Sequence, residues 1–169
     1  MTAGIPSTAA APAQVAWADG DLVVTRDFGA PRDLVFRAWT EAEHFARWWG
    51  PRNSTLSFCR LDARPGGTLH YCHRLPGDED VWVAGVYREV AAPERIAFTC
   101  FFSDEAGGRV ERPGFPPEMT ITVTFAEHGG GTRVTARHMG LEEDRGEVQG
   151  WIEGLDRLEE YLAGASTTR

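Results

Sequence analysis

The last long segment of the chain, EVQGWIEGLDRLEEYLAG, has the apolar periodicity of an α-helix. Asp144 followed three residues later by Glu147 is a helix-start pattern, and Gly164 lies where a C-terminal capping glycine is typical. We therefore predict a helix over about residues 145–163. Its apolar side chains recur every three or four positions, which places them on one stripe that must cover another element; they are Val148, Trp151, Ile152, Leu155, Leu158 and Leu162.

Alternation of apolar and polar residues predicts strands over most of the region between residues 21 and 138. In the last hairpin the alternation is clearest, because Met119, Ile121 and Val123 are separated by threonines, so one sheet face is dry and the other wet. The terminal helix should cover the dry face. The predicted strands span residues 21–28, 56–63, 68–75, 81–90, 96–102, 119–127 and 132–138.

Two short helices should connect the first strand to the others. Pro31 suits the first turn of a helix, since its missing N–H group needs no partner there, and this helix runs through Trp39. Thr40 with Glu43 forms a capping-box pattern that restarts the helix to about residue 48, before a Gly-Pro pair. A polar loop over residues 103–117 is long enough to form a lid or rim.

The composition predicts one domain. With 169 residues, of which 42% are hydrophobic, the chain is long enough for one well-buried core and short for two. We place this domain at residues 21–164, between a flexible N-terminal tail (1–20) and a flexible C-terminus (165–169). The tail lacks the features of a signal peptide, and no run approaches the roughly 18 apolar residues of a membrane span. We therefore expect a cytoplasmic protein.

Charge and cysteine content exclude several functions. A formal net charge of −8 disfavours nucleic-acid binding, which needs a basic surface opposite the phosphates. The three cysteines, Cys59, Cys72 and Cys100, have no CxxC spacing, so we expect reduced, buried thiols and neither disulfides nor a zinc site. The sequence contains neither a phosphate-binding loop nor a serine in a GxSxG elbow. We accordingly predict no metal and no cofactor.

Five segments resemble a known family, in order and at consistent spacing. They are APRDLVFRAWTEAEHFARWWGP (30–51), LDARPGG (61–67), GVYREV (85–90), GGGTRVT (129–135) and GWIEGLDRLEEYL (150–162). These segments resemble the activator of Hsp90 ATPase homologue 1-like family of the START and Bet v 1-like superfamily, also called the polyketide cyclase and lipid transport group. The resemblance covers about residues 21–164.

The resemblance implies a helix-grip fold of the α+β class. In this fold a curved antiparallel sheet of about seven strands carries two short helices, and a long C-terminal helix lies over its concave face. Members of the superfamily share a cavity between sheet and helix, and they include lipid carriers, polyketide cyclases and proteins that bind or sequester aromatic natural products. A shared fold does not decide among these activities.

Aromatic residues are concentrated in the segments that would surround such a cavity. Any single one of them can simply fill the core, but together with the resemblance they predict a partly hollow core, since ligand pockets are lined mainly by such side chains. The predicted cavity residues are Phe45, Trp48, Trp49, Tyr71, His73, Trp82, Tyr87, Phe98, Phe102, Met119, Ile121, His138, Trp151 and Leu155.

Histidines and a tyrosine are the polar candidates. His70 and His73 are three apart on a predicted strand, so they point to opposite faces, and at most one can enter the cavity. His138 lies on the dry face of the last hairpin and is the first choice for a histidine that binds a ligand or acts as an acid or base. A hydrogen-bonded histidine at a strand end is the alternative. Tyr87 is a third candidate.

Two glycines lie inside the predicted terminal helix, Gly150 and Gly154. Each destabilises a helix by roughly 1 kcal/mol relative to alanine. Either they allow the close approach of a ligand or a neighbouring backbone, or they are tolerated in a glycine-rich chain. Their spacing leaves both interpretations open.

Three functions are compatible with these residues and with the resemblance. The first is binding of a hydrophobic, aromatic or polyketide-like small molecule in the cavity, for a carrier, sequestration or resistance role. The second is a cyclase or aromatase in which His138, His70 or Tyr87 moves a proton. The third, suggested by the name of the family, is a cofactor of an Hsp90-type chaperone.

Overall fold

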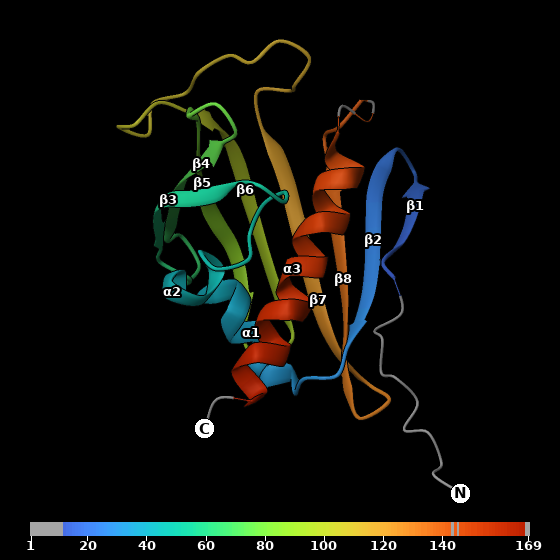
Figure 1. Ribbon diagram of the computed structural model, residues 1–169. Coiled ribbons are helices and arrows are strands. Elements are labelled where there is room, and N and C mark those ends of the chain that lie inside the picture. Colours follow the sequence, from blue (N-terminus) through green and yellow to red (C-terminus); the bar gives the residue numbers. More distant parts are fainter. Residues whose placement is uncertain (1–11, 143, 145, 168–169) are drawn as a thin grey trace, which may run out of the picture.

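A computed structural model gives residues 12–142, 144 and 146–167 as one antiparallel sheet of eight strands with three helices (Figure 1). The strand order is β1-β2-β8-β7-β6-β5-β4-β3, so the first strands pair with the last one. The strands are β1 (Gln14–Ala18), β2 (Asp21–Phe28), β3 (Thr55–Leu61), β4 (Thr68–Leu75), β5 (Glu79–Ala91), β6 (Arg95–Ser103), β7 (Met119–His128) and β8 (Gly131–Met139). The helices are α1 (Arg32–Thr40), α2 (Ala42–Phe45) and α3 (Glu147–Thr167).

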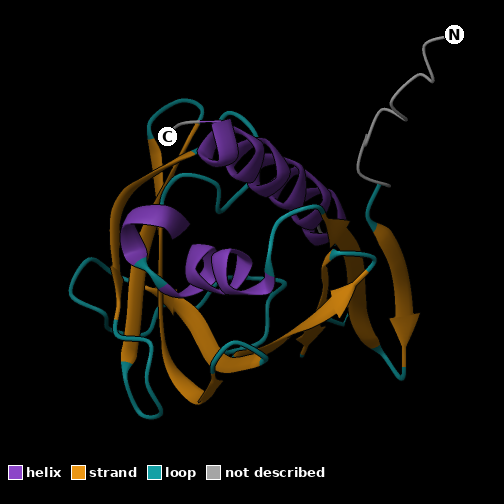
Figure 2. Cartoon of the chain, turned by 90° about the horizontal axis from the view of Figure 1, so that it is seen from below, coloured by secondary structure: helices purple, strands orange, loops and turns teal. Residues whose placement is uncertain are grey.

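The sheet curves around the helices, as the view from below in Figure 2 shows. Helix α3 crosses the concave face, with its C-terminal end beside α1 and its N-terminal end toward the loop that joins β6 to β7 (Figure 1). This arrangement confirms the predicted α+β class, with a curved antiparallel sheet, short helices and a long C-terminal helix.

The strands agree closely with the predicted ranges, but the sheet has an additional one. Strand β1 falls within the predicted N-terminal tail, so this prediction is wrong for residues 14–18; residues 1–11 lie outside the described part of the chain. Trp17 pairs with Leu22 across a two-residue turn in which Asp19 and Gly20 have φ of 53° and 83°. Asp-Gly is a strong sequence pattern for such a hairpin.

The helix boundaries differ from the prediction at two places. Thr40 does not cap a new helix, because it ends α1 and its hydroxyl donates to the Phe36 carbonyl oxygen at 2.9 Å; α2 is then only one turn long and ends at Phe45. Helix α3 does not end before Gly164 but continues to Thr167, since Gly164 does not adopt the left-handed conformation of a capping glycine.

The predicted start of α3 at residue 145 lies outside the described residues, but its cap is visible. The Asp144 carboxylate accepts hydrogen bonds from the backbone N–H groups of Gly146 at 2.9 Å and Val148 at 3.3 Å. The Val148 N–H belongs to the first turn of α3, where a helix has no internal acceptor for it, and Gly146 directly precedes that turn. The predicted capping role of Asp144 is therefore confirmed.

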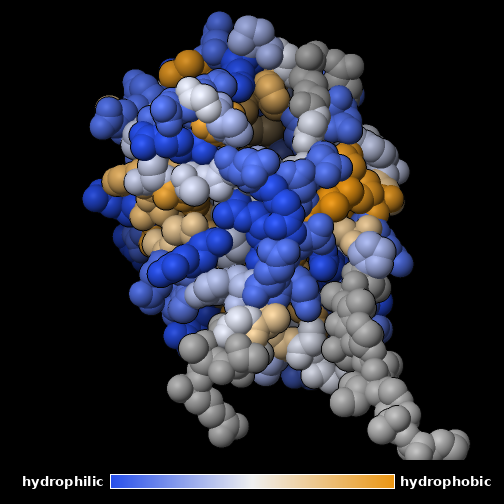
Figure 3. Space-filling model, viewed as in Figure 1, coloured by the Kyte–Doolittle hydropathy of each residue, from blue (hydrophilic) through white to orange (hydrophobic). Residues whose placement is uncertain are grey.

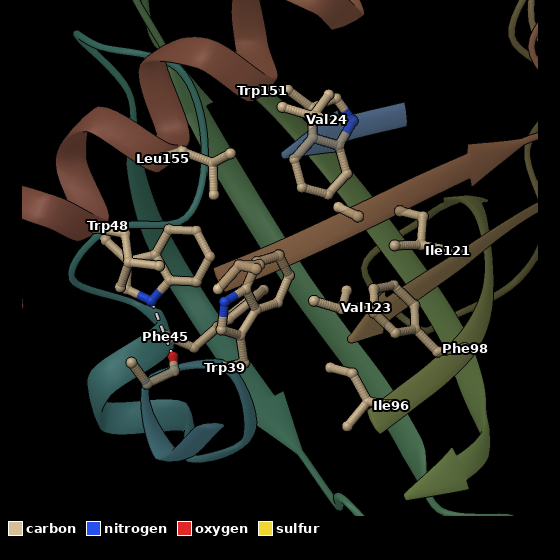
Figure 4. Close-up of a cluster of buried hydrophobic side chains, with 14 of the residues drawn as sticks. Val24, Trp39, Phe45, Trp48, Ile96, Phe98, Ile121, Val123, Trp151 and Leu155 are labelled. Atoms are coloured by element: carbon tan, nitrogen blue, oxygen red, sulfur yellow. Dashed lines mark hydrogen bonds between the residues drawn. The ribbon is translucent and has the colours of Figure 1, made fainter. Parts of the chain in front are cut away.

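From Leu155 onward, α3 covers a well-packed core, and Figure 4 shows Leu155 above Trp39 and Trp48 in this core. Leu155 and Leu158 are fully buried, and the Trp39 ring packs edge-on against Trp48 at 4.7 Å and Phe125 at 6.1 Å between centroids. The Trp48 indole N–H donates to the Ala38 carbonyl oxygen at 2.9 Å. We call this region the packed half; it comprises Leu155, Leu158, Leu162, Trp39, Trp48 and Phe125 with their neighbours.

A buried charge joins the helix to the sheet. Arg26 of β2 faces the concave side, where its side chain is 6% exposed and forms an ion pair with Asp156 of α3. The three cysteines are free thiols; Cys72 and Cys100 are buried as predicted, whereas Cys59 is only partly buried.

Candidate functional site

A pocket of about 190 Å³ lies between the N-terminal half of α3 and the concave face of the sheet. Figure 3 shows the surface hollowed beside the N-terminal end of α3. The lining is mainly apolar, as in small-molecule sites, although the volume is below the roughly 300–1,000 Å³ of pockets for drug-sized ligands. We call this region the hollow half; its lining is Trp49, Gly50, Pro51, Tyr71, His73, Val81, Val83, Cys100, Phe102, Met119, Ile121, His138, Glu147, Gly150, Trp151 and Gly154.

The structure brings many of the predicted cavity residues to this pocket and places the others elsewhere. Phe45, Trp48, Tyr87, Phe98 and Leu155 are buried in the packed core. The predicted residues that line the pocket are Trp49, Tyr71, His73, Phe102, Met119, Ile121, His138 and Trp151.

Trp82 was assigned to the cavity but lies on the convex face of the sheet. Its ring packs against His70 at 5.0 Å and Phe58 at 5.5 Å between centroids. Successive side chains of a strand alternate between faces, so the neighbours Val81 and Val83 enter the pocket instead. Strict alternation along β5 would have identified these two valines from the sequence.

His70 and His73 lie on opposite faces, as their spacing predicts. His70 joins Trp82 on the convex side, where its Nε2 lies 3.4 Å from the Asp104 carbonyl oxygen. His73 lines the pocket. Tyr87, the other polar candidate, packs against Phe98 in the core, where burial raises the pKa of its hydroxyl. Of the three proposed acid-base residues, His138 alone lines the pocket.

His138 is held as a neutral ring with a defined proton position. Burial lowers its pKa from 6.5 to about 4. Its Nδ1 accepts a hydrogen bond from the Trp151 indole N–H at 3.1 Å, so the ring proton must lie on Nε2. Nε2 in turn lies 3.2 Å from the sulfur of Met119. His138 therefore presents a donor, and its acceptor nitrogen is already occupied.

His73 is the second neutral histidine of the pocket. Burial, with a smaller contribution from the Arg157 cation, lowers its pKa from 6.5 to about 4. Its Nδ1 is buried and has no hydrogen-bond partner among the described residues. Gly50, with φ of 110°, lies against this ring, and a Cβ atom there would come within 2.8 Å of Nδ1. The glycine thus lets the loop after α2 close over His73.

The two glycines of α3 form part of the pocket wall. A Cβ atom at Gly150 would meet no atom within 4 Å, so this position opens onto free space. A Cβ atom at Gly154 would lie 3.6 Å from the Gly50 carbonyl oxygen, which is an ordinary contact distance. Gly150 therefore widens the pocket, and Gly154 faces the backbone of the loop that closes it. The sequence leaves such a role open for both glycines, and the structure adds them to the predicted cavity residues.

The pocket contains no activated thiol. Cys100 lines it, and burial raises the pKa of this thiol to about 12, so the sulfur is protonated and weakly nucleophilic near neutral pH.

Potential metal ligands come together at another place. Glu41, Glu43 and His44 have ligand atoms within 4.8 Å of one another beside α2. His44 lies 3.0 Å from the Glu41 carboxylate and 2.5 Å from the Tyr161 hydroxyl oxygen. Hydrogen bonding within this surface cluster accounts for its geometry without an ion.

None of the helices in the described part of the chain has the length and apolar character needed to cross a membrane.

Comparison with known proteins identifies relatives of the whole domain. The sequence model of activator of Hsp90 ATPase homolog 1-like proteins matches residues 29–163. A crystal structure of a protein from Nitrosomonas europaea is 28% identical to the chain, with a TM-score of 0.73, over 86% of this chain and 96% of that chain. No curated protein matches the sequence.

Two further structures support the fold. One, from Mycobacterium smegmatis, is 23% identical, with a TM-score of 0.76 over 95% of this chain and 98% of that chain. Another, named an AHSA1 protein, from Silicibacter pomeroyi, is 23% identical, with a TM-score of 0.70 over 86% of this chain and 99% of that chain. At this level of identity the similarity extends to the fold and not to the activity.

Proposed function

The chain belongs to the activator of Hsp90 ATPase homolog 1-like family, and from this premise we propose that it binds a small, hydrophobic, aromatic molecule in the hollow half. The observation that carries the proposal is the pocket itself. Protein interiors are packed to the density of organic crystals, so a pocket beside a well-packed core is unusual and is consistent with a binding site. Gly150 leaves space in this pocket, because it has no side chain at a position where an alanine would fit and would stabilise the helix.

The lining supports an aromatic and largely uncharged ligand. The indole rings of Trp49 and Trp151 meet edge to face at 5.4 Å between centroids and offer both faces and edges for stacking. His73 and His138 are neutral and supply a few polar atoms for orientation. The volume of about 190 Å³ favours a molecule smaller than a multi-ring polyketide, which would require the pocket to widen.

Tryptophan fluorescence tests this proposal, because two of the lining residues are tryptophans. Titration with a panel of small aromatic compounds should quench or shift the emission and saturate with one binding site. Native mass spectrometry of the freshly purified protein should show whether a small molecule accompanies it.

A filled pocket provides the matched control. In Gly150→Leu the added side chain should occupy the open space and abolish binding, whereas Gly164→Leu places the same side chain on an exposed part of α3 and should leave binding unchanged. Equal binding by both variants, or a wild-type protein that binds no member of the panel, would overturn the proposal.

The alternative of a cyclase or aromatase has less support from the geometry. A general base needs a free lone pair at the pocket, and among the three residues predicted for proton transfer His138 has its acceptor nitrogen occupied by Trp151. His70 lies on the opposite face of the sheet and Tyr87 in the packed core. The positions of these three residues therefore support ligand binding more than proton transfer.

A further inference from the structure

The pocket wall contains a hydrogen-bond donor with a poor acceptor. Because Trp151 donates to Nδ1 of His138, the Nε2–H of this histidine is a donor only, and its partner is the thioether sulfur of Met119 at 3.2 Å. A thioether is a weak acceptor. A methionine side chain is also flexible and can move aside at little cost. Since both residues line the pocket, an oxygen atom of a ligand can take the place of the sulfur.

The charges of the lining residues restrict which chemical group of a ligand can provide that oxygen. Among the described residues that line the pocket, Glu147 alone has a formal charge, and it is negative. Among these described lining residues an anionic ligand would therefore lose its hydration without meeting a cation, which is strongly unfavourable in an apolar site. A hydroxyl oxygen could also accept from His138, but its own proton would then need a second partner, such as the Glu147 carboxylate. A carbonyl oxygen brings no proton, so the single donor of His138 satisfies it.

We infer that the ligand is an uncharged aromatic carbonyl compound, such as a ketone, quinone or ester, whose carbonyl oxygen accepts the Nε2–H of His138 in place of the Met119 sulfur. This inference rests on the proposed function and adds the chemical class of its ligand. His138 acts as a binding and selecting residue, and Trp151 positions it by fixing the ring proton on Nε2.

Three probes of one shape separate the possible ligand classes: 2-acetylnaphthalene, 2-ethylnaphthalene and 2-naphthoate. Their dissociation constants are measured by tryptophan fluorescence near pH 7 with the full chain. Because the ethyl compound is more hydrophobic, the informative quantity is the ratio of the acetyl to the ethyl affinity, compared between wild type and variants. We expect naphthoate to bind most weakly.

Two variants should move this ratio in opposite directions. His138→Phe keeps an aromatic ring but removes the donor, and the preference for the acetyl compound should fall about tenfold, as expected for one hydrogen bond. Met119→Leu conserves volume and removes the competing sulfur, so the Nε2–H lacks an acceptor without ligand and the preference for the acetyl compound should rise several-fold. A purely structural role of either residue would change both affinities equally.

An infrared measurement tests the hydrogen bond to the ligand carbonyl directly. The carbonyl stretch of bound 2-acetylnaphthalene should shift to lower frequency in wild type, as for a hydrogen-bonded ketone, and return toward the apolar-solvent value in His138→Phe. An unshifted carbonyl in wild type, an unchanged affinity ratio in Met119→Leu, or tighter binding of naphthoate would overturn the inference while leaving the proposed function intact. Binding of none of the three probes would overturn both.

Discussion

The packed half and the hollow half beneath α3 are bounded by the same helix and sheet, but they differ in how fully side chains fill them. Both lie between one helix and the concave face of one sheet, and both are rich in aromatic residues. In the packed half, α3 contributes Leu155 and Leu158, which are fully buried against the aromatic cluster of Trp39. In the hollow half it contributes Gly150 and Gly154, which precede these leucines in the sequence, and a pocket remains. The size of the side chains on α3 therefore determines which part of the core is filled.

The largest expected effect compares the same truncation in both halves. Phe125 of β7 is buried beside Phe36 and Trp39, whereas Phe102 of β6 is half-buried at the pocket. Phe125→Ala should lower the free energy of unfolding by about 3–5 kcal/mol, because it leaves a cavity in a solid core. Phe102→Ala should lower it by only about 1–2 kcal/mol, since that ring already borders empty space. Urea denaturation measures both; equal losses would mean that the two halves are packed alike.

The next effect concerns the buried charge that joins helix and sheet. Asp156→Ala leaves Arg26, whose side chain is 6% exposed, without its ion-pair partner. Removing one member of a fully buried pair destabilises by roughly 3–5 kcal/mol. We expect about 2–3 kcal/mol here, because the Asp156 side chain is 38% exposed and water can partly replace it. The double variant Arg26→Met with Asp156→Ala should recover much of this loss. Failure to recover it would indicate that the contribution of Asp156 does not depend on Arg26.

The hollow half should make stability depend on pH. His73 and His138 have folded-state pKa values of about 4, below the ordinary value of 6.5, so the unfolded chain binds more protons between these values. Stability is therefore lost as the pH falls from about 6.5 toward 4. Between pH 7 and 5 each histidine should contribute a loss of about 2 kcal/mol. Denaturation of wild type and His138→Gln at both pH values measures this, and an equal pH dependence in the two proteins would exclude a contribution from His138.

The sequence was sufficient for the fold because its patterns are local. The period of two in β7 and β8 and the spacing of Leu155, Leu158 and Leu162 each follow from burial on one side of an element. The additional strand β1 has a local cause as well, because the Asp19-Gly20 turn lets residues 14–18 pair with β2. Thr40 shows a limit of local patterns, because its hydroxyl bonds to its own helix instead of starting the next one.

The pocket could be predicted only in part, because it depends on distances between elements. The aromatic residues predicted to line the cavity include Trp49 and Trp151, which do so. They also include Trp48 and Phe98, which fill the packed core instead. Trp82 lies outside the pocket because it alternates along β5 with Val81 and Val83, which face inward. The partners of His138 could not be predicted, since the hydrogen bond from Trp151 joins β8 to α3 across the fold.

The smallest effect bears most directly on why the hollow half is hollow. Gly150→Ala should raise the free energy of unfolding by about 0.5–1 kcal/mol, because alanine is the better helix former and its methyl group meets no atom. The same methyl group takes space from the pocket, so the affinity for 2-acetylnaphthalene should fall. A Cβ atom added at Gly164 also meets no atom within 4 Å, so Gly164→Ala is the matched control and should stabilise with no change in affinity.

Stability and binding are thus expected to change in opposite directions at Gly150 alone. A sequence selected only for a stable helix would contain alanine there, and the fold would accept it. If Gly150→Ala stabilised the protein and left the affinity undiminished, the glycine would not be what keeps the pocket open, and the volume of Trp49 and Trp151 would have to explain it. If affinity falls as stability rises, the glycine exchanges helix stability for room in which a ligand can bind.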